Sequence, residues 1–231
     1  MKPVDLPSVL TIDGPSGSGK GTISRRAAEM LGWHLLDSGA LYRLLVHAAF
    51  LAEVPSDDAT RLGSLARGLK VDFQQTPAGV ERILLDGQDV TRAVRSEECG
   101  ARASQLAVLP EVRTGLQALQ RRFRQLPGLV ADGRDMGTVI FPDAGLKIYL
   151  TASVAERAQR RYNQLKEKGF DANLHALLQD IAARDERDQS RSISPLKPAD
   201  DAILVDTTGR SIQQVVETVM SLARQRFIEQ R

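Results

Sequence analysis

VLTIDGPSGSGKGT, residues 9–22, is the stretch that decides the fold of this chain. Its apolar start, Val9–Ile12, predicts a short buried strand, and Asp13-Gly14-Pro15 predicts a turn after it. Gly14 followed after four residues by Gly19-Lys20 matches the first part of a phosphate-binding P-loop. Apolar residues then recur at helical spacing from Ile23 to Leu31. A strand, a glycine-rich loop and a helix in this order form the arrangement that a phosphate cradle needs.

The residue types in this loop suit an anion. Glycines let the backbone curl so that successive N–H groups face one phosphate, and the following helix adds the positive end of its dipole. Lys20 supplies a mobile charge, and Thr22 is the nearest hydroxyl for Mg²⁺, although position 21 is Gly where the strict pattern has Ser or Thr. The alternative is a glycine-rich turn without a ligand. The expected ATP-binding residues are Gly14, Pro15, Ser16, Gly17, Ser18, Gly19, Lys20, Gly21 and Thr22.

Further along the chain, short apolar runs alternate with helical patterns. Strand-like runs follow at residues 35–36, 129–131, 146–150 and 202–205, and helical patterns at residues 41–49, 111–124, 154–168, 174–188 and 212–227. Strands that alternate with helices indicate βαβ units and therefore a parallel sheet covered on both faces. The sequence predicts an α/β fold with a P-loop core.

Residues 53–98 interrupt this alternation. A short helix is expected around Thr60–Leu69, and two strand-like runs, residues 71–73 and 80–85, flank the turn sequence Thr76-Pro77-Ala78-Gly79. We expect a small antiparallel β subdomain here. The core would then comprise residues 1–52 and 99–231, with a helical lid around residues 157–171.

Composition narrows the function classes. The 231 residues carry a net charge of +2, with 42% hydrophobic and 26% charged residues, which excludes a disordered chain and argues against a protein that coats nucleic acid. The cations are 24 Arg and 7 Lys, a skew that suits anionic ligands or reflects codon usage. Cys99 is the single cysteine, so no intramolecular disulfide can form. No apolar run reaches the length of a membrane span, and no signal-peptide pattern precedes the first strand, so we expect a cytoplasmic protein.

Several motifs identify the kind of P-loop protein. The Asn-Lys-x-Asp motif by which GTPases read their base does not occur, and the ending Gly-Lys-Gly-Thr resembles nucleoside monophosphate kinases. The chain further resembles the bacterial cytidylate kinases in four motifs that follow in the same order, namely TIDGPSG (residues 11–17), LDSGALYR (36–43), ADGRDMGT (131–138) and RDERDQSR (184–191). The resemblance implies ATP-dependent phosphorylation of CMP and dCMP, with Mg²⁺ bound together with ATP, by a monomer without nucleic-acid or membrane partners.

The arginines fit this reaction on physical grounds as well. A phosphate acceptor is already anionic, so the reaction needs positive charge rather than a general base, and an Arg fork binds two phosphate oxygens at once. Arg134 follows a predicted strand at the edge where open α/β sheets bind ligands. Arg184, Arg187 and Arg191 would share one helical face if the helix continues that far. A solvated, ion-paired helix surface is the alternative for this last group.

The resemblance assigns roles to individual residues. Ser38, Arg43, Arg134 and Arg184 would hold the CMP phosphate, whereas Ser104, Arg113, Asp135 and Arg191 would read cytosine and Asp188 would bind the sugar hydroxyl. The expected catalytic residues are Lys20, Arg134, Arg184 and the lid cations Arg157 and Arg161, with Arg160 as a further lid cation. Thr22 would bind Mg²⁺ directly and Asp132 through water; Asp13 is the alternative to Asp132.

Two other readings stay open. One is a P-loop kinase for another small acceptor, such as UMP or a non-nucleotide alcohol, although an alcohol would need a general base. The other is a non-catalytic nucleotide-binding or RNA-binding protein, against which the 4% aromatic content weighs because RNA recognition relies on stacking.

Overall fold

The computed structural model describes residues 6–75, 81–167, 169 and 171–227. The chain forms two compact units, one of Met1–Asp37 together with Phe123–Arg231 and one of Ser38–Arg122. The range expected for the inserted subdomain, residues 53–98, lies inside the second unit, which begins earlier and ends later.

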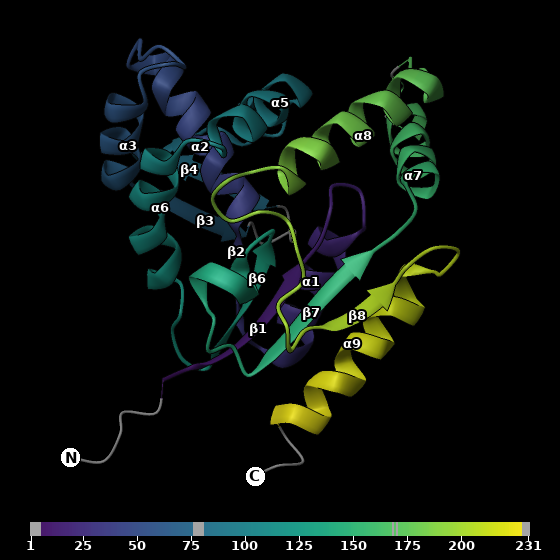
Figure 1. Cartoon of the computed structure of the whole chain (residues 1–231). Coiled ribbons are helices and arrows are strands. Elements are labelled where there is room, and N and C mark those ends of the chain that lie inside the picture. The colour runs from purple at the N-terminus through teal and green to yellow at the C-terminus, as the bar shows by residue number, and fades with distance from the viewer. Residues whose placement is uncertain (1–5, 76–80, 168, 170, 228–231) are drawn as a thin grey trace, which may run out of the picture. The chain divides into compact units, whose positions relative to one another are not determined.

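A parallel sheet forms the centre of the first unit (Figure 1). Its strands, in the order in which they lie side by side, are β2 (His34–Asp37), β6 (Gly128–Gly133), β1 (Ser8–Asp13), β7 (Leu146–Thr151) and β8 (Ile203–Asp206). Every neighbouring pair runs parallel, which confirms the predicted α/β fold.

The register of the sheet brings the functional segments to one edge. Asp13, the last residue of β1, lies opposite Gly133 on β6 and Tyr149 on β7. The three strands therefore end close together, and the loop after β1 starts next to Arg134, which follows β6. This is the edge at which open parallel sheets bind their ligands.

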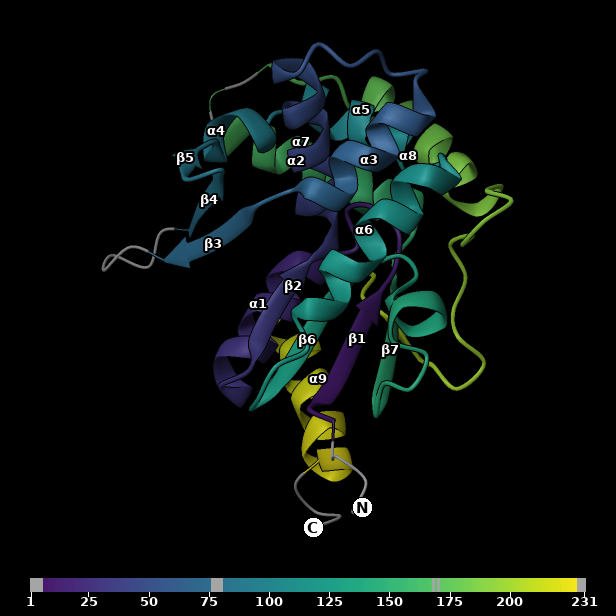
Figure 2. The same cartoon turned by 90° about the vertical axis from the view of Figure 1, so that its left-hand side faces the viewer.

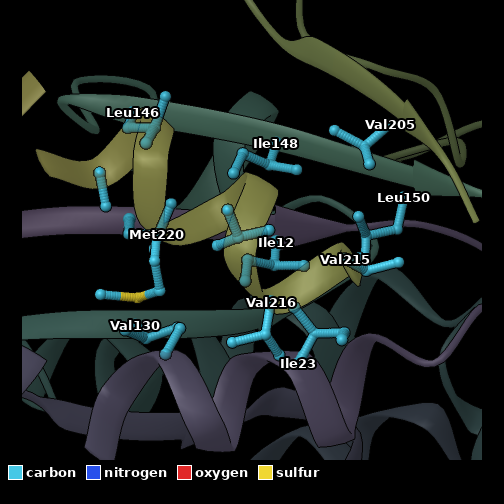
Figure 3. Packing of buried hydrophobic residues seen from close by; sticks show 14 of the residues in the cluster. Ile12, Ile23, Val130, Leu146, Ile148, Leu150, Val205, Val215, Val216 and Met220 are labelled. Carbon is cyan, nitrogen blue, oxygen red and sulfur yellow. The ribbon is translucent and has the colours of Figure 1, made fainter. Parts of the chain in front are cut away.

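The core of this unit packs two helices against the sheet. Val9, Leu10 and Ile12 of β1 are fully buried, as expected for a central strand covered on both faces. Ile23 of α1 (Lys20–Leu31) and Val216 of α9 (Ile212–Phe227) belong to the same buried cluster, and Figure 3 shows them beside Ile12. This packing fixes α1, and with it the loop that precedes α1.

The remaining elements of the first unit lie around the ligand-binding edge. They are the short π-helix η1 (Met136–Ile140) and the two helices α7 (Val154–Glu167) and α8 (Leu174–Gln189), which pack against each other. The expected helices at 154–168, 174–188 and 212–227 are confirmed to within one residue at each described end, and residue 168 lies outside the described part. η1 was not predicted, because five residues with a glycine give no periodic signal.

The second unit contains helices and a small antiparallel sheet, whose three strands Figure 2 shows beside α4. Its elements are α2 (Ser38–Leu51), α3 (Ala59–Gly68), β3 (Val71–Gln75), β4 (Glu81–Leu85), β5 (Gln88–Asp89), α4 (Thr91–Val94), α5 (Glu97–Leu106) and α6 (Pro110–Arg122). The short helix and the antiparallel strands are confirmed, whereas the expected turn Thr76–Gly79 lies outside the described residues. α5 was not predicted.

None of the helices in the described ranges combines the length and the apolar character needed to cross a lipid bilayer.

Candidate active site

The loop between β1 and α1 has the backbone of a phosphate cradle. Gly17 and Gly19 have φ angles of 78° and 88°, in the left-handed region that glycine adopts without strain. Gly14 lies so close to β7 that a Cβ atom there would stand 2.2 Å from the carbonyl oxygen of Leu150. The glycines at these positions therefore serve the curl of the loop and its close packing on the sheet.

Side chains from other parts of the unit hold the carbonyl oxygens of this loop. The Arg157 guanidinium donates to the oxygen of Ser16 at 3.0 Å, and the Thr207 hydroxyl donates to that of Ser18 at 3.3 Å. The Ser18 hydroxyl itself donates to the oxygen of Pro15 at 3.0 Å. With these carbonyls occupied by protein donors, the loop offers its N–H groups to an anion.

Lys20 opens α1 in a strongly positive environment. Its Nζ donates to the carbonyl oxygen of Pro15 at 3.2 Å. Burial, and then the charges of Arg134 and Arg184, lower the pKa of Lys20 to about 8, while Asp132 and Asp37 act in the opposite direction. Three cations predicted from separate motifs thus converge at the loop, an arrangement that an anionic ligand would relieve.

Asp188 joins two of the predicted arginines in a buried network. Arg134 donates to its Oδ2 at 3.0 Å, and Arg191 donates to its Oδ1. The side chains of Asp188 and Arg191 are 2% and 4% exposed. Burial raises the pKa of Asp188, but the charges of Arg134 and Arg191 outweigh it and hold the pKa below its ordinary value.

Arg157 is buried beside the loop and makes a two-pronged ion pair. Its Nη1 and Nη2 donate to the two carboxylate oxygens of Asp185 at 3.0 and 2.5 Å, and its Nε donates to the carbonyl oxygen of Ala152. A Cβ atom on Gly17 would stand 3.1 Å from the Cβ of Arg157. Arg157 therefore connects α7, α8 and the loop.

The other two lid cations lie differently. Arg160 stands next to Gly19, with Nη1 4.0 Å from the position of a Cβ there, and donates to both the hydroxyl and the carbonyl oxygen of Thr207. Arg161 donates to Gln164 along α7 at 3.2 Å. Of the three, Arg157 and Arg160 are the ones placed at the loop.

The residues expected at the Mg²⁺ site provide suitable donors. A Cβ atom on Gly21 would stand 3.4 Å from Oδ2 of Asp132, so this carboxylate borders the start of α1, where Thr22 is exposed. In the described ranges no group of three or more His, Cys, Asp or Glu side chains is arranged to hold a metal. Hard oxygen donors in small number suit an Mg²⁺ ion that keeps waters and phosphate oxygens as its main ligands.

Asp13 is engaged elsewhere. Its Oδ1 accepts the backbone N–H of Met136 at 2.9 Å and its Oδ2 that of Gly137 at 2.8 Å. Burial raises the pKa of Asp13 to about 7, although these two hydrogen bonds lower it. Since both oxygens face the start of η1, Asp132 suits the Mg²⁺ site better than Asp13 does.

Asp135, the residue before η1, is also buried and 4% exposed.

The second unit holds the other predicted CMP-binding residues. Arg43 on α2 donates to the carbonyl oxygens of Val94 and Ser96 at 2.9 and 2.8 Å. Arg113 on α6 is 8% exposed, lies over the ring of Tyr42, and donates to the carbonyl oxygen of Ala107.

Two serines complete this set. Ser38 opens α2 and is 4% exposed. Ser104 on α5 is 3% exposed, and its hydroxyl has no hydrogen-bond partner within the described part of the chain. A buried hydroxyl without a partner costs free energy, so a ligand atom beside Ser104 would be favourable.

Sequence reasoning did not find three of the supporting residues. In the sequence, Asp185 is one member of the charged run 184–191, and Thr207 lies in none of the motifs. Asp13 suggests only a ligand of Mg²⁺. For all three residues the sequence offers only their position as a signal. Each lies at or just after the end of a strand, or on a helix that carries predicted site residues. Such a position does not identify the residue with which the side chain will interact.

The chain is similar in sequence to known proteins over most of its length. A sequence model of the cytidylate kinase family matches residues 10–225. A cytidylate kinase of Aeromonas salmonicida (strain A449) is 54% identical over 219 residues, which are 95% of each chain. Another, of Pseudomonas syringae pv. tomato, is 58% identical over 214 residues, covering 92% of this chain and 93% of the relative.

Solved structures align over most of the chain at low identity. A gluconokinase from Sinorhizobium meliloti 1021 is 16% identical with a TM-score of 0.47, covering 96% of this chain and 94% of the other. A TM-score of this size carries no argument about function, so the sequence relatives decide the family.

Proposed function

Because the chain belongs to the cytidylate kinase family, we propose that it transfers the γ-phosphoryl group of ATP to CMP and dCMP, giving the diphosphates. The enzyme is a phosphotransferase. The observation that supports the chemistry best is the convergence of Lys20, Arg134 and Arg184 at a loop whose carbonyl oxygens are held by protein donors.

ATP would bind with its phosphates on the loop Gly14–Thr22. The N–H groups of the loop and the start of α1 would surround the phosphate oxygens, and Lys20 would leave the carbonyl oxygen of Pro15 to reach them. Mg²⁺ bound with ATP would be held by the Thr22 hydroxyl and, through water, by Asp132. It supplies charge neutralisation for the phosphate oxygens.

The acceptor would be held by arginines. Ser38, Arg43, Arg134 and Arg184 would bind the CMP phosphate, whose negative charge makes a general base unnecessary. Asp188 already orients Arg134 through a hydrogen bond of 3.0 Å and would bind the sugar hydroxyl.

Cytosine would be read by buried polar groups. Asp135 is a suitable partner for the exocyclic amine, because a base without that donor leaves a buried carboxylate without its hydrogen bond. Ser104, Arg113 and Arg191 would contact the rest of the base, and the Ser104 hydroxyl supports this assignment.

Arg157 and Arg161 would act as lid cations on the phosphates, and the contacts of Arg160 with the loop segment make it a third candidate. Closure of a lid excludes water, which would otherwise hydrolyse ATP.

Location, oligomeric state and partners are part of the same proposal. We infer from the family that the protein is a cytoplasmic monomer acting on small molecules, without nucleic-acid or membrane partners.

A coupled assay of ADP release tests the function directly. Purified protein with ATP and Mg²⁺ is offered CMP, dCMP, UMP, AMP and GMP in parallel, with the Lys20→Ala variant as the matched control. We expect rapid turnover with CMP and dCMP, slower turnover with UMP, and none with the purine nucleotides. ATP turnover with none of the five acceptors would reject the proposal, and equal rates on CMP and UMP would reject the base-reading assignment.

A further inference from the structure

Thr207, the residue directly after β8, contacts three other segments of the first unit with one side chain. Its hydroxyl accepts a hydrogen bond from Nη1 of Arg160 on α7 at 3.0 Å. The same hydroxyl lies 3.3 Å from the carbonyl oxygen of Ser18 in the phosphate loop and 3.0 Å from that of Thr151 at the end of β7. Thr207 is 2% exposed, so these bonds are shielded from water.

The single hydrogen of this hydroxyl has two carbonyl oxygens within reach. The oxygen of Thr151 already accepts the backbone N–H of Thr207 at 2.8 Å. It therefore does not depend on the hydroxyl, and the hydrogen can serve the oxygen of Ser18. Thr207 thus keeps one carbonyl group of the loop turned toward the protein, which favours the binding of an anion by the neighbouring N–H groups.

Arg160 is held by three hydrogen bonds. Its Nε donates to Glu156, one turn earlier on α7, at 3.0 Å, and its Nη2 donates to the carbonyl oxygen of Thr207 at 2.6 Å. Together with the bond from Nη1 to the Thr207 hydroxyl, three of the five N–H groups of Arg160 have acceptors in the described part of the chain. The other two, one on each Nη, are suited to phosphate oxygens.

The guanidinium of Arg160 stands where a phosphate would bind. Its Nη1 lies 4.0 Å from the position that a Cβ atom would take on Gly19, the residue before α1. The first N–H groups of a helix have no partner within the helix, and the dipole is positive at this end. An anion is therefore favoured here, and a cation held beside the helix start adds to this preference.

We propose that Thr207 is a positioning residue for ATP, whose hydroxyl holds the Arg160 guanidinium and the Ser18 carbonyl oxygen in one arrangement around the phosphates. The inference rests on the ATP binding proposed for the phosphate loop. It deepens that proposal by naming a residue outside both the loop and α7 that aligns the two. Thr207 acts through these groups and does not itself contact the nucleotide.

The substitution Thr207→Val examines this role with little change in shape. Valine keeps a branched side chain and the backbone carbonyl that binds Arg160, but it lacks the hydroxyl. Thr207→Ser keeps the hydroxyl and loses only a methyl group, so it tests for rescue. Thr218→Val is the matched control, because the Thr218 hydroxyl likewise accepts an arginine, Arg210, at 2.6 Å and donates to a carbonyl oxygen, that of Gln214, at 3.0 Å.

The experiment combines binding and kinetics. Calorimetric titration gives the Kd of a non-hydrolysable ATP analogue, and the coupled assay of ADP release gives the KM values for ATP and for CMP, in the wild type, T207V, T207S and T218V. A double-mutant cycle of the Kd with Arg160→Ala shows whether Thr207 acts through Arg160. Binding of the analogue needs no acceptor, so the Kd values test Thr207 independently of turnover.

We expect T207V to raise the Kd of the analogue and the KM for ATP by about tenfold, the effect of one charge-assisted hydrogen bond, and to leave the KM for CMP unchanged. T207S should restore most of the affinity, and T218V should retain the wild-type values. The increase in Kd in the double variant should be smaller than the product of the two single increases, because Thr207 and Arg160 act together.

An unchanged Kd in T207V would overturn the inference. Multiplying effects in the double variant, or no rescue by T207S, would also overturn it. An equal rise in the KM values for ATP and CMP would give Thr207 a general structural role instead. The expected Kd values in a protein that does not turn over CMP would reject the proposed acceptor and support the role of Thr207. Thermal melting identifies a variant that does not fold, and T207A would then replace T207V in the cycle.

Discussion

The charge of Lys20 depends on its surroundings in the site. Its pKa is lowered from 10.5 to about 8, first by burial and then by the charges of Arg134 and Arg184. A phosphate bound among these cations would restore the ordinary preference for the charged form. When ATP binds at a pH above the pKa that Lys20 has in the ligand-free protein, Lys20 should therefore take up a proton.

We expect wild-type protein at pH 8.5 to take up protons on binding ATP, and to take up fewer at pH 7, where Lys20 is already charged. Calorimetric titration in buffers of different ionisation enthalpy measures this uptake, and Lys20→Met is the control. Uptake of the same size in Lys20→Met would assign the proton to another group.

The lowered pKa of Lys20 also makes the stability of the folded protein depend on pH. Between about pH 8 and pH 10.5, Lys20 binds fewer protons in the folded, ligand-free protein than in the unfolded chain. The contribution of Lys20 to the free energy of unfolding therefore increases with pH in this range.

The charged form of Asp188 stabilises the folded protein at neutral pH, whereas the charged form of Lys20 costs free energy there. Its pKa lies below the ordinary 3.8, because the charges of Arg134 and Arg191 outweigh the effect of burial. Its stabilising effect is therefore fully present above pH 3.8 and is lost as the pH falls through the lower folded value.

We expect Asp188→Asn to reduce the free energy of unfolding at pH 7 by about 3–5 kcal/mol, because it leaves Arg134 and Arg191, whose side chains are 16% and 4% exposed, facing a neutral amide. Urea unfolding between pH 2 and pH 7 checks this. The difference between wild type and variant should shrink below pH 3.8, and a constant difference would contradict the linkage.

At the scale of elements, α7 and α8 are held to the phosphate loop by the Arg157–Asp185 ion pair. The side chains are 3% and 13% exposed, and the guanidinium also donates to the carbonyl oxygen of Ser16. Pairs of this kind depend on the planar fork of arginine, which lysine lacks.

We expect Arg157→Lys to reduce the free energy of unfolding of the ligand-free protein by about 2–3 kcal/mol, through the loss of charge-assisted hydrogen bonds. Arg82→Lys is the matched control, because the Arg82–Asp89 pair is 47% and 39% exposed and should contribute little. An unchanged free energy of unfolding in Arg157→Lys, together with a raised KM for ATP, would instead indicate that Arg157 acts mainly on the nucleotide.

The elements also show how far sequence reasoning reaches. The loop and α1 were predictable because strand, glycines and helix follow one another within 24 residues, and local physics specifies each. η1 was not predictable, because its cap comes from Asp13 and a contact 123 positions apart leaves no local pattern. The same applies to Arg157, for which the sequence indicated a phosphate-binding cation but not the carboxylate of Asp185.

At the scale of the whole molecule, a net charge of +2 says little about function, whereas the placement of the charges says a great deal. Lys20, Arg134 and Arg184 converge from three segments at the end of one sheet. Composition indicates the preference for arginine. The parallel register of β1 and β6 brings the segments that carry Lys20 and Arg134 together, and Arg184 comes from α8.

This arrangement predicts separate effects of the two substrates on stability. A ligand present at about 100 times its Kd raises the free energy of unfolding by about 2.7 kcal/mol, and each kcal/mol raises Tm by roughly 2–4 °C for a chain of this size. CMP and a non-hydrolysable ATP analogue should each stabilise the wild type by this amount.

The Lys20→Ala variant should keep the shift with CMP, lose most of the shift with the ATP analogue, and lose most turnover. Differential scanning fluorimetry with each ligand alone measures both shifts. Loss of the CMP shift as well, or a lowered Tm without ligand, would give Lys20 a structural role.

The phosphate loop lies early in the sequence, but a residue that holds one of its carbonyl oxygens lies late in it. The loop is complete in sequence by residue 22, but β1 pairs with β6 and β7, and Thr207 holds the carbonyl oxygen of Ser18. During synthesis from the N-terminus, Thr207 becomes available only long after residues 14–22 have been made. A nascent chain that stops at residue 200 would therefore carry every residue of the ATP loop and still lack the hydroxyl that holds the Ser18 carbonyl oxygen.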